Sequence, residues 1–235
     1  MLLAAGRGTQ MRPLSELTAL PLLKLGGRTL LDHALDHLAE AGVRRAVVNA
    51  HWHADHVARH LTLRHGQPET MLHREEVPLD TGGAVRAALD VLGAEPFFVV
   101  NGDSLWLEGP TPALGRLQRA WTDEADAVLL VQRTCMTRAG SGVGDFVLDP
   151  LGGVRRRRER EVAPFVYAGV QLVAPRLFAG APEGAFSMNL LWDRAIEAGR
   201  LRAVVHDGLW FHFATPADLA AAETALRVRR TGQSR

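Results

Sequence analysis

The chain of 235 residues contains one cysteine and one tyrosine, and aromatic residues make up only 6% of it. The single cysteine, Cys135, cannot form an internal disulfide, which is typical of a protein in a reducing compartment. No apolar run approaches the ~20 residues that a membrane-spanning helix needs. The apolar start of the chain is also too short for a signal peptide. We therefore expect a cytoplasmic protein with no membrane partner.

An excess of charge of one sign is also absent. The formal net charge is +1, and no basic stripe is interleaved with aromatic residues, so a nucleic-acid partner is not expected. The apolar fraction of 47% and the charged fraction of 23% are ordinary for a globular protein. A chain of this length is long enough to bury the core of one α/β domain.

Short apolar runs alternate with amphipathic segments, a pattern that predicts strand–helix units and a mainly parallel sheet. The expected strands are residues 1–4, 45–49, 70–73, 97–100, 125–131, 165–173, 204–206 and 209–213. The expected helices are residues 30–40, 54–63, 83–92, 188–198 and 216–228. Asp207-Gly208 is expected to turn the last two strands as a hairpin. No repeat or long linker is present, so we predict a single domain over residues 1–228 and a flexible tail over residues 229–235.

A glycine-rich segment follows the first expected strand. Residues 3–14 read Leu-Ala-Ala-Gly-Arg-Gly-Thr-Gln-Met-Arg-Pro-Leu. Gly6 and Gly8 would let the backbone adopt positive φ and approach a ligand, and consecutive amides in such a turn bind anions. A nucleotide phosphate often lies at this end of the first strand. The segment lacks the Lys-Ser/Thr of a Walker A loop and the third glycine of a dinucleotide-binding loop, so a tight turn without a ligand is the alternative.

Two further polar segments lie next to predicted elements. Asn101-Gly102-Asp103 follows an apolar strand directly, which places a carboxylate at a strand end. An Asx-type turn is the alternative interpretation of Asp103. The segment Asp-Thr-Gly-Gly over residues 80–83 precedes a helix, where its glycines would let a nucleobase pack on the backbone and its amides would read the base edge. Capping of that helix is compatible with this interpretation.

Together these segments resemble the motifs of sugar-1-phosphate nucleotidyltransferases. The loop of that family is approximately Leu-Ala-Ala-Gly-x-Gly-Thr-Arg-Met/Leu-x-Pro-Leu-Thr. Further similar blocks follow in the same order over nearly the whole chain, at residues 26–33, 80–83, 101–103, 144–146 and 209–213. The short length and the Gly-Asp-Phe block at residues 144–146 are most similar to the N-acetylmuramate 1-phosphate uridylyltransferases, which serve peptidoglycan recycling. Mannose- and glucose-1-phosphate nucleotidyltransferases are close relatives and remain an alternative.

The resemblance implies a three-layer, Rossmann-like nucleotidyltransferase fold of the α/β class with a mixed, mostly parallel central sheet. The N-terminal half would bind nucleotide and the C-terminal half sugar phosphate. UMP from UTP would pass to a sugar 1-phosphate such as N-acetylmuramate 1-phosphate, and pyrophosphate would leave. The substrates are then a nucleoside triphosphate and a sugar 1-phosphate, and the cofactor is Mg²⁺, with Mn²⁺ as the alternative. We expect a monomer or a weak homodimer.

The implied site residues fall into four groups. The catalytic group is Asp103, Arg12 and Gln10. The nucleotide-binding group is Ala4, Ala5, Gly6, Arg7, Gly8, Thr9, Asp80, Thr81, Gly82, Gly83 and Asn101. The sugar-phosphate group is Asp145, Gly144, Tyr167 and Asn189. The metal ligands are Asp103 and His212.

The chain departs from the family pattern at four of its positions. Gln10 stands in place of an arginine and Leu20 in place of a lysine, which removes two positive charges from the triphosphate site. His212 stands in place of a second metal-binding aspartate, and imidazole suits Mn²⁺ better than Mg²⁺. Ala214 replaces a glycine. These changes leave a second hypothesis open, a weakened or non-catalytic homologue that binds nucleotide or nucleotide sugar as a sensor. A GT-A-like glycosyltransferase is a third, which the glycine loop argues against.

Overall fold

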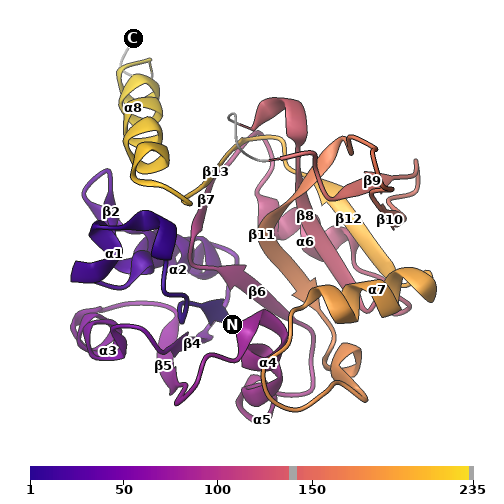
Figure 1. Cartoon of the computed structure of the whole chain (residues 1–235), viewed down its shortest axis with the longest axis horizontal. Coiled ribbons are helices and arrows are strands. Elements are labelled where there is room, and N and C mark those ends of the chain that lie inside the picture. The colour runs from indigo at the N-terminus through magenta and orange to yellow at the C-terminus, as the bar shows by residue number, and fades with distance from the viewer. Residues whose placement is uncertain (138–141, 233–235) are drawn as a thin grey trace. The chain divides into compact units, whose positions relative to one another are not determined.

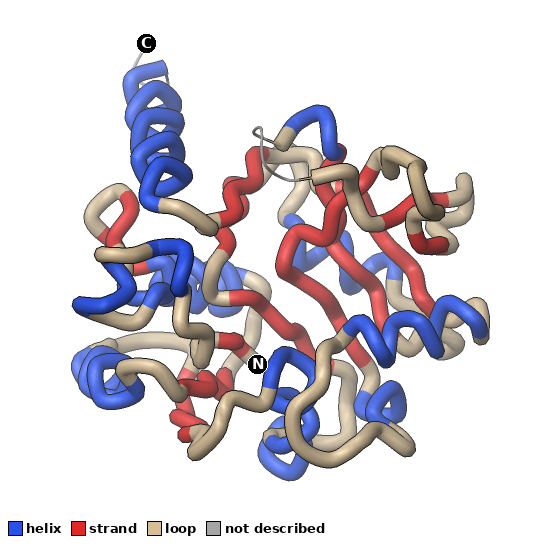
Figure 2. The backbone as a smooth tube through the Cα atoms, in the orientation of Figure 1, coloured by secondary structure: helices blue, strands red, loops and turns tan. Residues whose placement is uncertain are grey.

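The computed structural model describes residues 1–137 and 142–232, which form two compact units. Unit 1 consists of Met1, Pro78–Asn101 and Trp106–Trp210, and unit 2 of Leu2–Val77, Gly102–Leu105 and Phe211–Arg235. Figure 1 labels the helices and strands, and Figure 2 shows that both units combine strands with helices. Within the described residues, no helix has both the length and the apolar character needed to cross a membrane.

Unit 2 is built on three parallel strands, β1 (Leu2–Leu3), β4 (Arg45–Ala50) and β5 (Glu69–Arg74). Strand β4 is central, because it pairs with β1 on one side and with β5 on the other. Parallel strands need a crossover, and helices α2 (Leu30–Glu40) and α3 (Ala54–Leu63) supply it. The apolar centre of β4 is buried, as expected for a strand covered on both faces.

Short elements complete unit 2. They are the 3₁₀ helices η1 (Thr9–Met11) and η2 (Leu20–Leu22), helix α1 (Leu14–Leu17), and strands β2 (Lys24–Leu25) and β3 (Arg28–Thr29). The C-terminal helix α8 runs over Pro216–Gly232, beyond its predicted end at residue 228. Its Glu223 accepts a hydrogen bond from the amide of Gly26 at 2.8 Å, which fastens the helix to the β2–β3 turn. Residues 233–235 of the expected tail lie outside the described residues.

Unit 1 is built on a mixed sheet. Its strands are β6 (Phe97–Asn101), β8 (Ala127–Arg133), β9 (Phe146–Leu148), β10 (Val154–Arg156), β11 (Phe165–Val173) and β12 (Leu201–Val205). Strand β11 pairs antiparallel with β6, β8 and β9, while β8 and β12 are parallel and β9 and β10 antiparallel. Hence β6, β8, β9 and β12 point one way, and only β10 and β11 among these strands point the other.

The helices of unit 1 are α4 (Asp80–Ala87), α5 (Leu89–Leu92), α6 (Ala113–Ala120) and α7 (Asn189–Glu197), with 3₁₀ helices η3 (Thr134–Met136) and η4 (Pro175–Phe178). In Figure 1, α7 lies in front of the strands of this unit and α6 behind them. The helix predicted over residues 83–92 is divided at Ala88 into α4 and α5. Helix α6 and strands β9 and β10 were not predicted, because each is short and the two strands lie beside glycine-rich and arginine-rich segments.

The predicted hairpin at Asp207-Gly208 is wrong. Strand β13 (Leu209–His212) pairs with β7 (Ser104–Leu107), while β12 pairs with β8. Strands β12 and β13, which Asp207-Gly208 connects, therefore belong to different sheets and do not pair as a hairpin. The predicted class is confirmed nonetheless, since most strands run in one direction and helices flank them.

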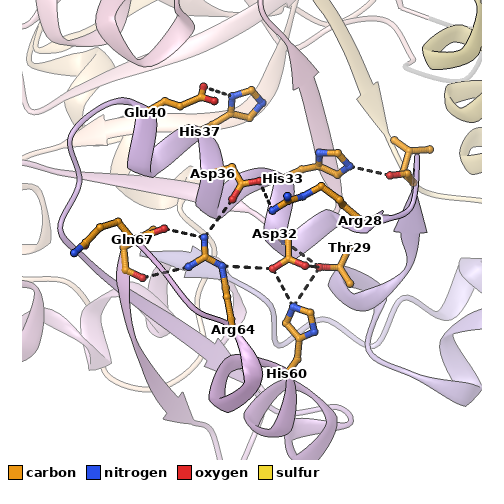
Figure 3. Close-up of polar contacts among 12 residues, drawn as sticks. Arg28, Thr29, Asp32, His33, Asp36, His37, Glu40, His60, Arg64 and Gln67 are labelled. Carbon is orange, nitrogen blue, oxygen red and sulfur yellow. Dashed lines mark hydrogen bonds and ion pairs between the residues drawn. The ribbon is translucent and has the colours of Figure 1, made fainter. Parts of the chain in front are cut away.

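A polar network joins helices α2 and α3 of unit 2 (Figure 3). The hydroxyl of Thr29 donates to Asp32 Oδ2 at 2.7 Å and accepts from the Asp32 amide at 3.0 Å, which caps α2. Asp32 Oδ1 lies 3.0 Å from His60 Nε2 and 3.5 Å from Arg64 Nε, at the end of α3. Arg64 also bridges to Asp36 at 3.2 Å, so the carboxylates of α2 fix the position of α3.

We predict that Asp32→Asn lowers the stability of the protein at pH 7 by roughly 1–3 kcal/mol. Burial raises the pKa of Asp32, but the hydrogen bonds from Thr29 and His60 outweigh it and hold this pKa below its ordinary value. The carboxylate therefore contributes stability above the unfolded-state pKa near 3.8, and this contribution is lost as the pH falls through the folded-state pKa. Urea unfolding at pH 7 and at pH 3 measures the difference.

Asp55→Asn is the matched control, since Asp55 makes an ion pair with Arg74 while its side chain is 88% exposed. It should leave the urea midpoint unchanged at both pH values. An Asp32→Asn protein as stable as the natural protein at pH 7 would show that the network contributes nothing.

Candidate active site

The glycine loop turns tightly at Gly8. This residue has φ 57° and ψ 41°, in the left-handed region, and its carbonyl accepts hydrogen bonds from the Met11 amide at 2.8 Å and the Ser15 hydroxyl at 2.7 Å. A Cβ atom at Gly8 would lie 2.9 Å from Cδ1 of Leu20, so both the conformation and the packing require glycine. Gly6 needs neither, because it lacks a positive φ and has open space beside it.

The amides of the loop divide into two kinds. The Ala4 amide donates to Asn49 Oδ1 at 2.8 Å, and Asn49 Nδ2 donates to the buried Glu75 at 2.6 Å. Ala4 was predicted to bind nucleotide, but this buried residue instead anchors the start of the loop. The amides of residues 5–8 make no hydrogen bond within the described part of the chain. These four N–H groups are therefore available to an anion.

The charged side chains of the loop are exposed, and each contacts a neighbouring side chain. The guanidinium of Arg7 lies 5.8 Å from the centre of the Trp52 ring, and the Trp52 indole donates to the Ser15 carbonyl at 2.8 Å. Arg12 makes an ion pair of 3.3 Å with Glu16. Gln10 is exposed, and Leu20 is buried beneath Gly8. Two arginines thus lie on the loop, while Leu20 packs where the family carries a lysine.

The turn that carries Asp103 is locked to the loop by Gly102. The Gly102 amide donates to the Leu3 carbonyl at 2.8 Å, one residue before the loop anchor. A Cβ atom at Gly102 would lie 2.6 Å from that carbonyl oxygen and 2.8 Å from Cγ of Pro21. No side chain fits there, so the glycine between Asn101 and Asp103 is required by close packing.

Asp103 and His212 lie side by side in unit 2. The carbonyl of Asp103 accepts the Phe213 amide at 2.8 Å, which brings His212 Nδ1 to 4.0 Å from Asp103 Oδ1. The Asp103 side chain is 41% exposed, yet its Oδ1 atom is shielded from water. This burial raises the pKa of Asp103, and the charge of His212 partly opposes the rise.

These two residues fit a divalent cation. Among the described residues, Asp103 Oδ1 has no hydrogen-bond partner, and a bound cation is one group that would satisfy this acceptor. No group of three or more histidine, cysteine, aspartate or glutamate side chains is assembled in the described parts of the chain. Phosphate oxygens would have to supply the remaining ligands, which is how Mg²⁺ commonly binds in enzymes that act on nucleotides.

Unit 1 holds a cavity of about 250 Å³ that unites six of the predicted site residues. They are Asp80, Thr81, Asn101, Asp145, Tyr167 and Asn189. Predicted members of the nucleotide group and of the sugar group thus line a single pocket. Gly144 is not among its lining residues, because it packs at φ 75° against the Ala163 carbonyl and fixes the turn before Asp145.

Asp145 and Asn189 differ in what they offer a ligand. The Asp145 amide donates to Phe165, and its Oδ2 accepts the Tyr167 amide at 2.9 Å, which leaves Oδ1 for a ligand hydroxyl. Asn189 Oδ1 accepts from Arg156 at 2.8 Å, and its Nδ2 donates to the Ser187 hydroxyl at 3.1 Å. Asn189 therefore positions Arg156 and also lines the cavity.

The expected readout of a nucleobase by Gly82 and Gly83 does not fit the structure. Both amides donate to the Phe186 carbonyl, at 2.8 and 3.1 Å. A Cβ atom at Gly82 would clash with the Phe186 ring and lie 2.9 Å from its carbonyl oxygen. The Thr81 hydroxyl accepts the Met188 amide at 3.0 Å, directly before α7, and no side chain of a described residue caps α4. These glycines pack the wall of the pocket.

The sequence prediction missed five residues of the pocket, which are Arg156, Gln171, Ser187, Met188 and Trp192. Arg156 was treated as part of a solvated charge run, although alternation along a strand places it on the opposite face from Arg155. Trp192 lies three positions after Asn189 on the same helix, so the two share a face. Gln171 is a polar residue inside an apolar strand, which is a signal that could have found it. The Trp192 indole donates to Gln171 Oε1 at 2.9 Å.

We predict that Gly82→Ala destabilises the protein by about 1–3 kcal/mol, because the new methyl group overpacks the wall against Phe186. Gly115→Ala on helix α6 is the matched control. A Cβ atom at Gly115 would meet only the Arg119 side chain at 3.6 Å, so this change should be neutral or stabilising by up to ~1 kcal/mol. Urea unfolding compares the two, and equal stability of both variants would contradict the packing role of Gly82.

The chain is similar to known nucleotidyltransferases over nearly its full length. The Nucleotidyl transferase family matches residues 1–139. The N-acetylmuramate alpha-1-phosphate uridylyltransferase of Caulobacter vibrioides is 40% identical over 231 residues, which cover 96% of this chain and 96% of that protein. The enzyme of the same name from Neisseria meningitidis serogroup B is 29% identical over 226 residues, 95% of this chain and 96% of its own length.

A solved structure has the same fold. UDP-glucose pyrophosphorylase, crystallised with UDP-glucose, superposes with a TM-score of 0.81 at 15% identity and covers 97% of this chain and 97% of its own. This likeness confirms the predicted Rossmann-like nucleotidyltransferase fold. Since the relatives are enzymes, the enzyme hypothesis is favoured over the sensor and the glycosyltransferase. The chain belongs to the nucleotidyl transferase family, as a sugar-1-phosphate nucleotidyltransferase.

Proposed function

We propose that this protein transfers the uridylyl group of UTP to N-acetylmuramate 1-phosphate and releases pyrophosphate. The observation that carries the proposal is the 40% identity to the Caulobacter vibrioides uridylyltransferase, which extends over 96% of both chains. Identity of this extent spans the glycine loop, the Asp103 turn and the sugar pocket alike. Glucose and mannose 1-phosphates are the alternative acceptors that the test below includes.

The reaction is an exchange of bonds at one phosphorus atom. An oxygen of the sugar 1-phosphate attacks the α-phosphorus of UTP, and the bond from that phosphorus to the oxygen bridging to the β-phosphate breaks. The bridging oxygen leaves with pyrophosphate. Because the attacking phosphate oxygen is already an anion, no general base is required. Catalysis then rests on positioning and on neutralising the charge that the two substrates bring together.

Residues of unit 2 are suited to the triphosphate. The amides of residues 5–8, which are unpaired within the described residues, supply four N–H donors. Arg7 and Arg12 supply the positive charge that the neutral side chains of Gln10 and Leu20 do not. Asp103 and His212 would hold a divalent cation, Mg²⁺ or Mn²⁺, which when bound neutralises phosphate charge and polarises the α-phosphate. The imidazole of His212 favours Mn²⁺ more than a second carboxylate would.

The pocket of unit 1 is suited to the sugar. Asp145 Oδ1 is an acceptor for a ring hydroxyl, and Asn101 and Tyr167 line the same cavity. Asp80 and Thr81 border the cavity beside the glycine wall, where they contribute polar atoms. A few polar groups in fixed positions on a packed wall are what orient a small ligand.

The proposal has three wider parts. The whole chain acts as one catalytic domain over residues 1–228, although it folds as two compact units. It works in the cytoplasm, which the exposed free thiol of Cys135 supports because such thiols persist in reducing compartments. It functions as a monomer or a weak homodimer.

The test is release of pyrophosphate from UTP, dTTP or GTP, offered with a panel of sugar 1-phosphates in Mg²⁺ and in Mn²⁺. We expect UTP with N-acetylmuramate 1-phosphate to give the highest kcat/KM and a UDP-sugar of the matching mass. Asp103→Asn should lower kcat by about 10²–10³, because it removes the charge that holds the cation. Higher activity with another base or sugar in this panel would move the assignment to that substrate.

Asp90→Asn is the matched control, because Asp90 is an exposed aspartate of α5 that no feature connects with the site. It should keep full activity. A natural protein that releases no pyrophosphate with any pair, or an Asp103→Asn protein with the natural rate, would sink the proposal.

A further inference from the structure

We propose that Arg156 makes the sugar pocket selective for a sugar that carries a carboxylate. N-acetylmuramate differs from N-acetylglucosamine by a lactyl ether on O3, which ends in such a carboxylate. The inference rests on the proposed function and adds to it the residue that reads this group. It also explains why an arginine is built into a pocket whose other charged residues are acidic.

The guanidinium group of Arg156 is held in a fixed orientation in the pocket wall. Its Nε donates to Asp193 Oδ1 at 2.6 Å, and its Nη2 donates to Asn189 Oδ1 at 2.8 Å. The guanidinium carbon lies 4.9 Å from the centre of the Phe146 ring and 5.8 Å from that of Trp192. Nη2 also donates to the Asn189 carbonyl at 3.3 Å. Three hydrogen bonds and two aromatic faces thus fix the plane of the guanidinium before any ligand arrives, and such preorganisation favours specific binding.

One nitrogen of the Arg156 guanidinium remains for a ligand. Within residues 1–137 and 142–232, no acceptor is within hydrogen-bonding distance of Arg156 Nη1, and the side chain is 32% exposed. A carboxylate is the ligand that a guanidinium binds with the strongest geometric match. Arg156 therefore offers two N–H donors in a fixed direction to an anion that enters the cavity.

The charge of the pocket makes Arg156 decisive for an acidic sugar. Among the described residues that line the cavity, Arg156 is the one basic side chain, and Asp80 and Asp145 are the acidic ones. Without the guanidinium these two carboxylates would repel an acidic substituent, while a neutral sugar would not be repelled. The loss of Arg156 should therefore penalise the carboxylate-bearing sugar much more than its neutral counterpart.

The experiment measures kcat/KM for three acceptors with UTP. They are N-acetylmuramate 1-phosphate, its lactyl methyl ester and N-acetylglucosamine 1-phosphate. The natural protein should use the ester roughly 10- to 100-fold less well than the acid, the loss expected for one charge-assisted hydrogen bond. Arg156→Met should lower the ratio of acid to N-acetylglucosamine activity by a similar factor, and Arg156→Lys should restore part of it.

Arg155→Met is the matched control, because Arg155 pairs with Glu161 at 2.7 and 2.8 Å and does not line the cavity. It should keep the natural ratio. An Arg156→Met protein that loses activity equally with both sugars would show that Arg156 holds the phosphate or the fold, and overturns the inference. A natural protein that uses the ester as well as the acid overturns it without any variant.

A failure of the proposed function is distinguishable from a failure of this inference. If the natural protein releases no pyrophosphate with any of the acceptors, calorimetry with free N-acetylmuramate and free N-acetylglucosamine still tests the pocket. Tighter binding of the acid that is lost in Arg156→Met supports the inference. Equal binding of the two sugars contradicts it.

Discussion

The hydrogen bond from the Gly102 amide to the Leu3 carbonyl is the constraint on which the rest of the proposed triphosphate site depends. It joins the end of β1, where the glycine loop starts, to the turn that carries Asp103. On the loop side, Asn49 and Glu75 anchor the next amide, that of Ala4. On the other side, the Asp103 carbonyl holds Phe213 and hence His212. The backbone segments that carry the loop, Asp103 and His212 are therefore held together mainly by backbone hydrogen bonds.

The sugar pocket is built on a different principle. Gly82 and Gly83, whose amides are already used, pack against Phe186 next to the lining residues Asp80 and Thr81, and the polar groups that face the cavity come from residues held by their neighbours. Arg156 illustrates this, because Asp193 and Asn189 fix it without removing its last donors. Glycine at residues 82 and 83 thus contributes shape, while Asp145 and Arg156 contribute charge in fixed places. Rigid support of this kind is what the proposed sugar pocket needs to distinguish similar sugars.

The sequence predicted the elements whose pattern is local. Helix α2 and strand β11 have the predicted bounds, because regular apolar spacing specifies them without help from distant residues. It predicted the loop, Asp103 and Asp145 through motifs that reflect backbone geometry. It could not predict the pairing of β13 with β7, because strand partners depend on contacts far apart in the chain. The roles of Gly82 and Arg156 were missed for the same reason, since each is decided by neighbours about 30 to 100 residues away, such as Phe186 and Asn189.

The measurement that tests this account most directly is the activity and stability of Gly102→Ala. The added methyl group would lie 2.6 Å from the Leu3 carbonyl oxygen, so the loop and Asp103 must move apart. The account predicts that pyrophosphate release falls by at least ~10²-fold while the protein still unfolds cooperatively, because a shift near 1 Å is enough to misplace reacting groups. A folded Gly102→Ala protein with the natural rate would contradict the claim that the loop and Asp103 act as one catalytic centre.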